Sequence, residues 1–416
     1  MSAMIPDRKC ITWHDSEPTG AIGWLVFDSL ASNVASGGLF MHSNATMKEA
    51  ADLAAMMTYK NSLQQPITGG AKGGIRFDHT HPEAKNVLRR FLIANKYYIK
   101  NFWNTGSDLN TDNTFIQSVI QKDLMLSSSF VSMATIFEKN FQYPNQSDKF
   151  LSKIETGIDS HFTLCTAATG YSVAMCIQKL VPRLPNIIIQ GFGTVGASLA
   201  YYIEKYRIGN IVGVIERDFF IYGKSSVSIF DMIRKHKNNI STLEKETKLI
   251  GLNFLHRKDT QNNEDFLYEC LSLQSADIFS PCATRYVITS RIATILIQKT
   301  FSFSKSPWVI SGANAVFNSK STLLLLYQKG INILPEWISN SGNTLLYNEL
   351  LKLTVKTIHV FDQIKSRIHV FLDEAVGKSL QDKISLFKSC ELLARKKISS
   401  ALDDCNNSGL IKKKAC

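Results

Sequence analysis

The sequence contains no run of about eighteen apolar residues, the length that a helix needs to cross a membrane. Its start, MSAMIPDRKCITWHDSEP, also lacks the basic stretch and apolar run of a secretory signal. We therefore expect neither membrane insertion nor export, and we predict a cytoplasmic protein. The 416 residues, 44% hydrophobic and 20% charged, are typical of a globular protein with about two to three domains.

Cysteine spacing of the kind that builds disulfide frameworks or zinc sites is also missing. The eight cysteines form no CxxC pair and no cluster with histidine, which such sites need. We therefore predict free thiols in a reducing compartment and no metal site. The residues are Cys10, Cys165, Cys176, Cys270, Cys282, Cys390, Cys405 and Cys416.

No recognised nucleic-acid-binding motif accompanies the formal net charge of +12. The basic residues are dispersed, with small clusters at Arg234–Lys237, Arg395–Lys397 and Lys412–Lys414. Dispersed charge is typical of a solvated surface, so we predict no nucleic-acid or membrane partner. The lysine-rich C-terminal end is interpreted as a frayed tail.

A strand–helix–strand unit with a glycine-rich turn is predicted between Asn186 and Glu216. The apolar, β-branched run NIIIQ predicts a strand buried on both faces. A helical segment and the strand NIVGVIE follow, and Glu216 stands twenty positions after the third glycine. This order is the context in which GxGxxG is typical of a dinucleotide site. The turn between the first strand and the helix consists of Gly191, Phe192, Gly193, Thr194, Val195 and Gly196.

The glycines and the acidic residue have separate expected roles. Gly191 makes the turn, Gly193 lets the backbone approach the pyrophosphate, and Gly196 packs the helix on the strand. Glu216 would accept hydrogen bonds from the adenosine ribose and disfavour a 2′-phosphate, whereas Arg217 could pair with that phosphate. NAD is therefore the predicted cofactor, with NADP possible. A Rossmann-like domain that binds no dinucleotide is the alternative.

A second glycine cluster surrounds a lysine in the segment TYKNSLQQPITGGAKGGIRFD. We expect these glycines to allow positive φ and close backbone approach around Lys72. A lysine in such surroundings can lose hydration and act as a base near neutral pH. Lys60 lies twelve residues upstream, at the end of a helix predicted from Thr46 to Leu63. Taken alone, the segment also fits a surface turn with a solvated lysine. The glycines are Gly69, Gly70, Gly73 and Gly74.

Six motifs in a fixed order make the chain resemble the glutamate/leucine/phenylalanine/valine dehydrogenase family. They are TYKNSL, GGAKGG, GSDLNTD, ATGYSV, the GxGxxG turn and SGAN, and the resemblance runs from about Gly37 to about Leu350. It implies an α/β fold with two domains and an active-site cleft between them. Residues 1–160, completed by helices at 345–416, would form the substrate-binding and oligomerisation domain, and residues 161–344 the Rossmann-type NAD(P) domain. The implied activity is reversible oxidative deamination of an L-amino acid to its 2-oxo acid and ammonia by a homo-oligomer.

The resemblance also implies roles for individual residues. Lys60 would hold the substrate α-carboxylate, neutral Lys72 would help water attack the iminium carbon, and Asp108 would move protons to and from the amino group. An ordinary Asx turn is the alternative for Asp108 and Asn110. The remaining implied contacts are Gly37, Gly38 and Asn110 at the substrate and Thr169, Ala283 and Asn314 at the cofactor.

Two departures from the family pattern concern the substrate. The glutamate-using branch has a lysine where this chain has Ser36, and a serine near the place of Tyr347. Without that cation a buried side-chain carboxylate is unpaired, which is costly. We therefore predict an apolar or aromatic substrate of the leucine, valine or phenylalanine type. A glutamate dehydrogenase with an atypical side-chain clamp stays open, as does an idle homologue that acts as a binding or regulatory subunit.

Overall fold

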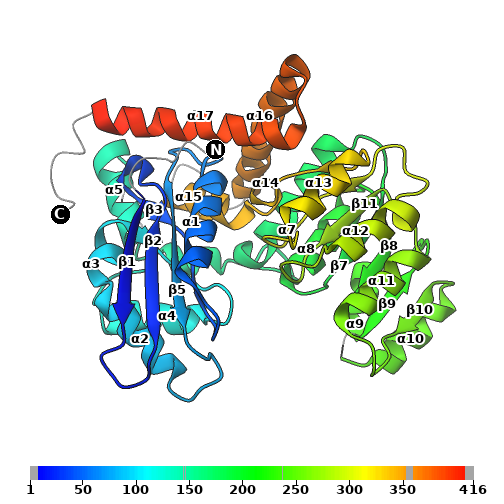
Figure 1. The fold of residues 1–416 in the computed structure, drawn as a ribbon, viewed down its shortest axis with the longest axis horizontal. Coiled ribbons are helices and arrows are strands. Elements are labelled where there is room, and N and C mark those ends of the chain that lie inside the picture. Colours follow the sequence, from blue (N-terminus) through cyan, green and yellow to red (C-terminus); the bar gives the residue numbers. More distant parts are fainter. Residues whose placement is uncertain (1–7, 144, 146, 237, 353–358, 408–416) are drawn as a thin grey trace. The chain divides into compact units, whose positions relative to one another are not determined.

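The computed structural model describes residues 8–143, 145, 147–236, 238–352 and 359–407 (Figure 1). The chain divides into two compact units. Unit 1 comprises Met1–Thr156, Thr344–Val360 and Glu391–Cys416, and unit 2 comprises Gly157–Asn343 and Phe361–Cys390. The basic cluster Lys412–Lys414 lies outside the described residues.

Unit 1 is built on a six-stranded mixed sheet in the order β1-β2-β5-β3-β6, with β4 also paired to β5. β5 is central, because it runs antiparallel to β2 and parallel to β3 and β4. The strands are β1 (Lys9–His14), β2 (Ile22–Phe27), β3 (Ala35–Ser36), β4 (Leu39–Met41), β5 (Gly69–Arg76) and β6 (Trp103–Asn104).

Helices cover both faces of this sheet because β2 alternates two sets of apolar residues. Trp24 and Val26 pack in one core with helix α1, whereas Leu25 and Phe27 pack in another with α2 and α4. The helices are α1 (Met47–Asn61), α2 (Ala84–Ala94), α3 (Lys96–Asn101), α4 (Asn113–Lys122), α5 (Val131–Phe141), α6 (Phe150–Ile154) and the 3₁₀ turn η1 (Ala31–Asn33). Two C-terminal helices also belong to unit 1 in part: α15 (Gly342–Leu351) from Thr344 onward, and α17 (Leu386–Asn407) from Glu391 onward.

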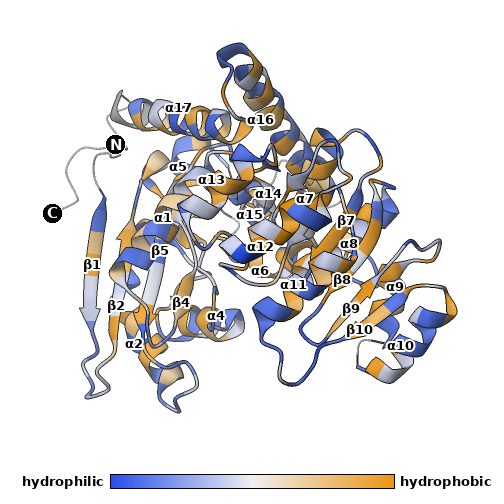
Figure 2. Ribbon diagram, turned by 45° about the vertical axis from the view of Figure 1, so that its right-hand side comes forward, coloured by the Kyte–Doolittle hydropathy of each residue, from blue (hydrophilic) through white to orange (hydrophobic). Residues whose placement is uncertain are grey.

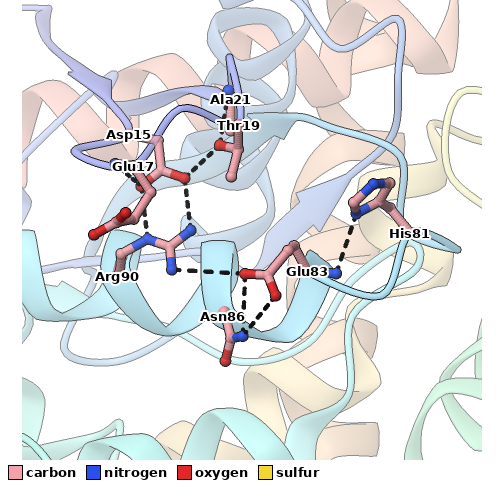
Figure 3. Close-up of polar contacts among 8 residues, drawn as sticks. All are labelled: Asp15, Glu17, Thr19, Ala21, His81, Glu83, Asn86 and Arg90. Carbon is pink, nitrogen blue, oxygen red and sulfur yellow. Dashed lines mark hydrogen bonds and ion pairs between the residues drawn. The ribbon is translucent and has the colours of Figure 1, made fainter.

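A partly buried ion pair ties the β1–β2 turn to α2 (Figure 3). Arg90 donates from Nε and Nη2 to the two carboxylate oxygens of Asp15, each at 2.7 Å, and that carboxylate is fully buried. The Arg90 guanidinium holds the pKa of Asp15 below its usual value. A hollow of about 480 Å³ beside the pair contains none of the predicted site residues. It is lined by Glu17, Pro18, Thr19, Phe77, His81, Glu83 and Arg90.

Unit 2 contains a seven-stranded sheet in the order β10-β9-β8-β7-β11-β12-β13. The strands from β8 to β13 in this order are parallel. β9 runs antiparallel to β8, and β10 runs antiparallel to β9; these two strands were not expected from the sequence. Figure 2 shows β7 and β8 as predominantly hydrophobic, as strands covered on both faces require. The strands are β7 (Asn186–Gln190), β8 (Asn210–Ile215), β9 (Phe219–Tyr222), β10 (Asn253–His256), β11 (Ile278–Pro281), β12 (Trp308–Val309) and β13 (Asn332–Ile333).

The helices of unit 2 pack around this sheet, and the long α7 lies against α8. They are α7 (Leu164–Leu180), α8 (Thr194–Lys205), α9 (Ile229–His236), α10 (Ile240–Leu249), α11 (Asn263–Leu273), α12 (Ser290–Ile295), the π-helical turn η2 (Leu296–Thr300), α13 (Lys320–Gln328), α14 (Glu336–Ser339) and α16 (Val360–Asp382). The fold is therefore two-domain α/β, with a Rossmann-type second domain.

The C-terminal helices differ from the predicted division of the chain. The sequence predicts that all of 345–416 belongs to the first domain, whereas α16 belongs to unit 2 from Phe361 onward. The physical reason is its packing on α7. The Phe361 ring stacks on Tyr171 with centroids 4.6 Å apart, and His369 Nε2 lies 3.2 Å from the carbonyl oxygen of Met175.

Candidate active site and dinucleotide site

Lys72 lies on the central strand of unit 1, on the sheet face that α1 covers. It is paired in register with Val26, which packs in the same core as α1. The Lys72 ammonium forms an ion pair with Asp108, and the two side chains are 6% and 28% exposed. The structure thus brings the two predicted catalytic residues into contact at a place that water reaches mainly from the side of Asp108.

The glycines around Lys72 serve close packing. They lie on strand β5, and none of them uses the positive φ that glycine permits. A Cβ on Gly70 would lie 2.2 Å from the backbone nitrogen of Thr58 and 2.4 Å from the carbonyl oxygen of Ala54. Both atoms belong to α1, so only glycine lets this helix lie directly on the strand. The expected close backbone approach is confirmed.

Lys60 reaches the same face of the sheet through α1. It lies in the last turn of that helix and is 7% exposed. Gly70 and Lys72 are two residues apart on β5 and therefore face the same way, toward α1. Asn61 Nδ2 donates to the carbonyl oxygen of Gly69 at 2.6 Å and fixes the helix end. One helix–strand contact thus positions both predicted lysines.

The segment from Ser36 to Gly38 runs beside β5. Gly73 donates from its backbone N–H to the carbonyl oxygen of Gly38 at 3.2 Å. A Cβ on Gly37 would lie 1.6 Å from the carbonyl oxygen of Ala71, so a side chain cannot be accommodated there. A Cβ on Gly38 would lie 3.3 Å from that of Asp108. Gly38 is therefore an immediate neighbour of the Lys72–Asp108 pair, whereas Ser36 is in register with Gly70, two residues before Lys72.

Ser36 is buried in a network of neutral side chains. Its Oγ accepts a hydrogen bond from Asn104 Nδ2 at 3.0 Å, and Asn104 Oδ1 accepts one from Ser132 Oγ at 2.8 Å. In the part of the chain that the structure describes, no basic side chain hydrogen-bonds to Ser36. Sequence reasoning missed Asn104 and Ser132, because neither stands in a motif.

The GSDLNTD loop is anchored to β4. Asn110, with φ of 60°, donates from Nδ2 to the carbonyl oxygen of Met41 at 3.0 Å. Thr111 donates from Oγ1 to the carbonyl oxygen of Leu39 at 2.7 Å and accepts from the backbone of Asp108 at 3.0 Å. These contacts show Asn110 holding the loop that presents Asp108 to Lys72. A contact of Asn110 with substrate stays a prediction.

Tyr347 lies in an aromatic cluster of unit 1. Its ring centroid is 5.0 Å from that of Phe130 and 5.5 Å from that of Phe150. Its helix, α15, is bound to the segment that joins Lys60 to Lys72, since Asn348 Nδ2 donates to the carbonyl oxygen of Pro66 at 3.2 Å. Sequence reasoning missed the two phenylalanines, which no motif marks.

The glycine-rich turn of unit 2 has the geometry that a pyrophosphate needs. Gly191 has φ of 90°, and a Cβ there would lie 2.6 Å from Ala283 Cβ. A Cβ on Gly196 would lie 1.8 Å from the carbonyl oxygen of Gly191, which explains the tight helix–strand packing. Space in front of Gly193 is open, and α8 begins after it at Thr194 without a side-chain cap. An uncapped helix N-terminus behind an open glycine fits the diphosphate of a dinucleotide.

Glu216 follows β8, and its side chain contacts the glycine-rich turn. One of its carboxylate oxygens accepts a hydrogen bond from the backbone N–H of Phe192. Arg217 next to it donates from Nε to a carboxylate oxygen of Asp218 at 3.2 Å. The acidic residue therefore lies at the glycine turn, and the neighbouring arginine is already paired.

The other predicted cofactor contacts are spread over unit 2. Thr169 is a partly exposed residue of α7, and Ala283 lies against Gly191. Asn314 follows β12, and its Oδ1 accepts a hydrogen bond from Asn340 Nδ2 at 2.8 Å. Burial raises the pKa of Cys282 to about 11, so its thiol stays protonated at neutral pH and is a poor nucleophile.

Three features of the described residues concern metals, membranes and thiols. No group of three His, Cys, Asp or Glu side chains among them could hold a metal ion. Over the same part of the chain, every helix is too short or too polar to cross a membrane. The cysteines whose side chains the structure describes are free: Cys10, Cys165, Cys176, Cys270, Cys282 and Cys390.

Two family models match the chain over most of its length. The model described as Glutamate/Leucine/Phenylalanine/Valine dehydrogenase matches residues 163–404, and the Glu/Leu/Phe/Val dehydrogenase dimerisation domain matches residues 11–122. The chain belongs to this family. It is an NAD(P)-dependent amino-acid dehydrogenase, an oxidoreductase, and the family resemblance is confirmed.

The known proteins similar to this dehydrogenase are named after more than one amino acid. A glutamate dehydrogenase from Aeropyrum pernix is 23% identical over 82% of this chain and 73% of its own. A hetero-hexameric glutamate dehydrogenase from Thermus thermophilus, in its leucine-bound form, is similar in fold with a TM-score of 0.68 and 18% identity over 95% and 89% of the two chains. L-tryptophan dehydrogenase from Nostoc punctiforme has a TM-score of 0.59 and 16% identity over 95% and 96%. The relatives include NAD-specific and NADP-specific glutamate dehydrogenases.

Proposed function

We propose that this dehydrogenase catalyses the reversible oxidative deamination of an L-amino acid with an apolar or aromatic side chain, giving the 2-oxo acid and ammonia. The contact between Lys72 and Asp108 in mostly buried surroundings carries the proposal. A cation and a carboxylate in contact are the acid and base that proton transfer to water and to an amino group requires. When bound, the nicotinamide cofactor accepts the hydride from the substrate α-carbon.

The side chains of unit 1 then have separate tasks. Lys60 binds the α-carboxylate, since its ammonium is a compact charge held at the end of α1. Asp108 takes a proton from the substrate ammonium, which leaves a neutral amine able to become an iminium. Lys72 first passes its ammonium proton to Asp108, whose partly exposed side chain releases it to solvent. The Lys72 amine then takes a proton from the water that attacks the iminium carbon. The direct contact between Lys72 and Asp108 allows protons to pass between them.

The surroundings of Ser36 and Tyr347 support an apolar or aromatic side chain. Ser36 offers a hydroxyl in a neutral network, and a hydroxyl is a weak partner for a buried carboxylate. Tyr347 brings Phe130 and Phe150 with it, so this helix contributes an aromatic surface. A tryptophan dehydrogenase with the same fold is in keeping with an aromatic substrate.

Glutamate dehydrogenase is the second candidate, because most relatives carry that name. Under this alternative, a basic residue at a position other than 36 must pair with the side-chain carboxylate of glutamate. We also propose NAD as the preferred cofactor. We propose a homo-oligomer as the active form, since the family model that matches residues 11–122 is described as a dimerisation domain. Sedimentation of the purified chain as a monomer only would contradict the oligomer.

Turnover of a panel of amino acids with NAD and with NADP tests the substrate. We expect kcat/KM for leucine, valine, phenylalanine or tryptophan to exceed that for glutamate by about ten- to a hundredfold, or roughly 1.4–2.8 kcal/mol. Glutamate as the best substrate by more than about tenfold would overturn the apolar pocket but leave the dehydrogenase in place. A chain that oxidises none of them in either direction would be the idle homologue.

The base is tested by Lys72→Ala. We expect kcat to fall by about 10²–10⁴-fold while the Kd for NADH stays close to that of the wild type. Lys48→Ala is the matched control, because Lys48 is an exposed lysine of α1 that pairs with Asp52 at 2.7 Å. Turnover of Lys72→Ala at the wild-type rate, with any accepted substrate, would remove Lys72 from the mechanism.

A further inference from the structure

A two-residue hairpin turn joins β8 to β9 directly after Glu216. Glu216 donates from its backbone N–H to the carbonyl oxygen of Phe219 at 2.8 Å, and the antiparallel β9 begins there. Arg217 and Asp218 are therefore the central residues of the turn. The order of charges along it is acidic, basic and acidic, directly beside the glycine-rich turn that Glu216 contacts.

Arg217 lies in this turn, and Arg257 joins it by donating from its backbone N–H to the carbonyl oxygen of Asp218 at 3.0 Å. Both side chains are already hydrogen-bonded. Arg217 donates from Nε to both oxygens of Asp218 at 3.2 and 3.3 Å and from Nη2 at 3.2 Å. Arg257 donates from Nε to the carbonyl oxygen of Gln261 at 2.9 Å and from Nη1 to Asn263 Oδ1 at 2.6 Å. The loop after β10 thus holds Arg257, and Asp218 holds Arg217.

We propose that Asp218 determines cofactor specificity, by keeping Arg217 from a 2′-phosphate and adding a second negative charge beside Glu216. NADP differs from NAD by this phosphate, which carries a charge of about −1.5 to −2. The phosphate would meet two carboxylates, and Arg217 could bind it only by leaving Asp218. The proposal rests on the proposed function only through the dinucleotide site, and it is independent of the amino-acid substrate.

The expected change in the Kd for NADPH follows from how exposed the Arg217 and Asp218 side chains are. The side chains of Arg217 and Asp218 are 79% and 51% exposed, so solvent and salt screen their charges. A single exposed charge changes the affinity for a nearby charged group by roughly three- to fivefold. Asp218→Asn should therefore tighten NADPH binding by about three- to fivefold and leave NADH binding within about twofold. Salt at about 0.5 M should remove most of this gain.

Fluorescence titration of the purified enzyme with NADH and with NADPH measures the two Kd values without any substrate. We expect the wild type to bind NADH more tightly, and Asp218→Asn to narrow the difference. Adding Arg217→Ala to Asp218→Asn should reduce the gain for NADPH to the part that comes from losing the Asp218 charge, because the released guanidinium produces the rest. Asp218→Ser, which also removes the charge from an exposed turn, should repeat the result if the asparagine variant folds poorly.

Asp373→Asn is the matched control. Asp373 is 65% exposed and pairs with Lys179 at 2.6 Å near the end of α7. That end leads into the start of β7, at the opposite end of the parallel strands from the turn after β8. The variant makes the same charge change in unit 2 and should leave the ratio of the two Kd values unchanged.

Four outcomes would overturn the proposal. They are a wild type that prefers NADPH, an Asp218→Asn variant with an unchanged ratio, a gain that Arg217→Ala leaves undiminished, and an equal gain in Asp373→Asn. Retained NADH preference without amino-acid oxidation would instead count against the proposed function. Binding of neither nucleotide would overturn the dinucleotide site, and the specificity proposal with it.

Discussion

Replacing Gly70 with alanine tests whether the glycines of β5 position α1. The added Cβ would lie 2.2 Å from the backbone nitrogen of Thr58 and 2.4 Å from the carbonyl oxygen of Ala54. Because non-bonded atoms need about 3.5 Å, the helix must move away by roughly 1 Å. Backbone atoms on both sides of the contact leave no flexible side chain to absorb this shift.

The shift has a cost in stability and a cost in activity. Overpacking a close contact destabilises by about 1–3 kcal/mol. The moved helix also carries Thr58 Oγ1, which donates to the buried Asp28 at 2.7 Å, so this bond lengthens. Lys60 moves with the same helix, and a misplacement of about 1 Å can reduce catalysis by roughly 10²-fold.

Urea unfolding and steady-state kinetics measure the two effects on Gly70→Ala. We expect the lower free energy of unfolding and the lower kcat/KM given above, with an unchanged Kd for NADH, because Gly70 lies in unit 1 and the glycine-rich turn in unit 2. Gly377→Ala on α16 is the control. Its Cβ would meet no atom within 4 Å, so stability should stay the same or rise by about 0.4–1 kcal/mol. Wild-type stability and activity in Gly70→Ala would refute the reasoning.

Two further predictions concern the substrate pocket and the β1–β2 turn. Ser36→Lys should narrow the preference against glutamate by about tenfold, because it supplies a cation for the side-chain carboxylate, and an unchanged ratio of kcat/KM values would remove residue 36 from the pocket. Arg90→Leu should lower the free energy of unfolding by about 1–3 kcal/mol at pH 7, because the Asp15 carboxylate loses its cation and keeps only Thr19 as a side-chain donor. Since Arg90 holds the pKa of Asp15 below 3.8, the pair stabilises the fold above that pH and the difference should shrink as the pH falls below it, whereas a pH-independent difference in urea unfolding would contradict this assignment.

The glycine-rich turn of unit 2 could be predicted closely from the sequence, because the residues that shape it are close together in the chain. The positive φ of Gly191 and the contact between Gly196 and Gly191 arise within six residues. The acidic residue then follows at the distance that one helix and one strand impose. Asp218 escaped notice because its importance lies in a side-chain contact with Arg217, which the sequence alone does not show.

For the region around Lys72 in unit 1, the sequence singled out the residues that lie together but not the strand and helix that hold them. A sequence with four glycines around a lysine fits a turn as well as a strand, because glycine permits both. The contacts that decide between them come from Ser29, Ala54 and Thr58, which lie from about ten to forty residues away. The assignment of α16 to unit 2 depends in the same way on Tyr171, far from Phe361 in the chain. Long-range packing of this kind leaves little trace in a single sequence.

The Lys72–Asp108 pair is better explained by chemistry than by stability. Burying an ammonium and a carboxylate costs solvation free energy that their attraction only partly restores, and apolar residues of similar volume are often as stable in such a place. The surrounding strand already has its backbone bonds to β2, β3 and β4, so folding does not require the pair. Asp108 keeps 28% of its side chain exposed, which leaves one member of the pair open to a ligand. A costly pair that is open on one side is in keeping with the proton transfer that we propose.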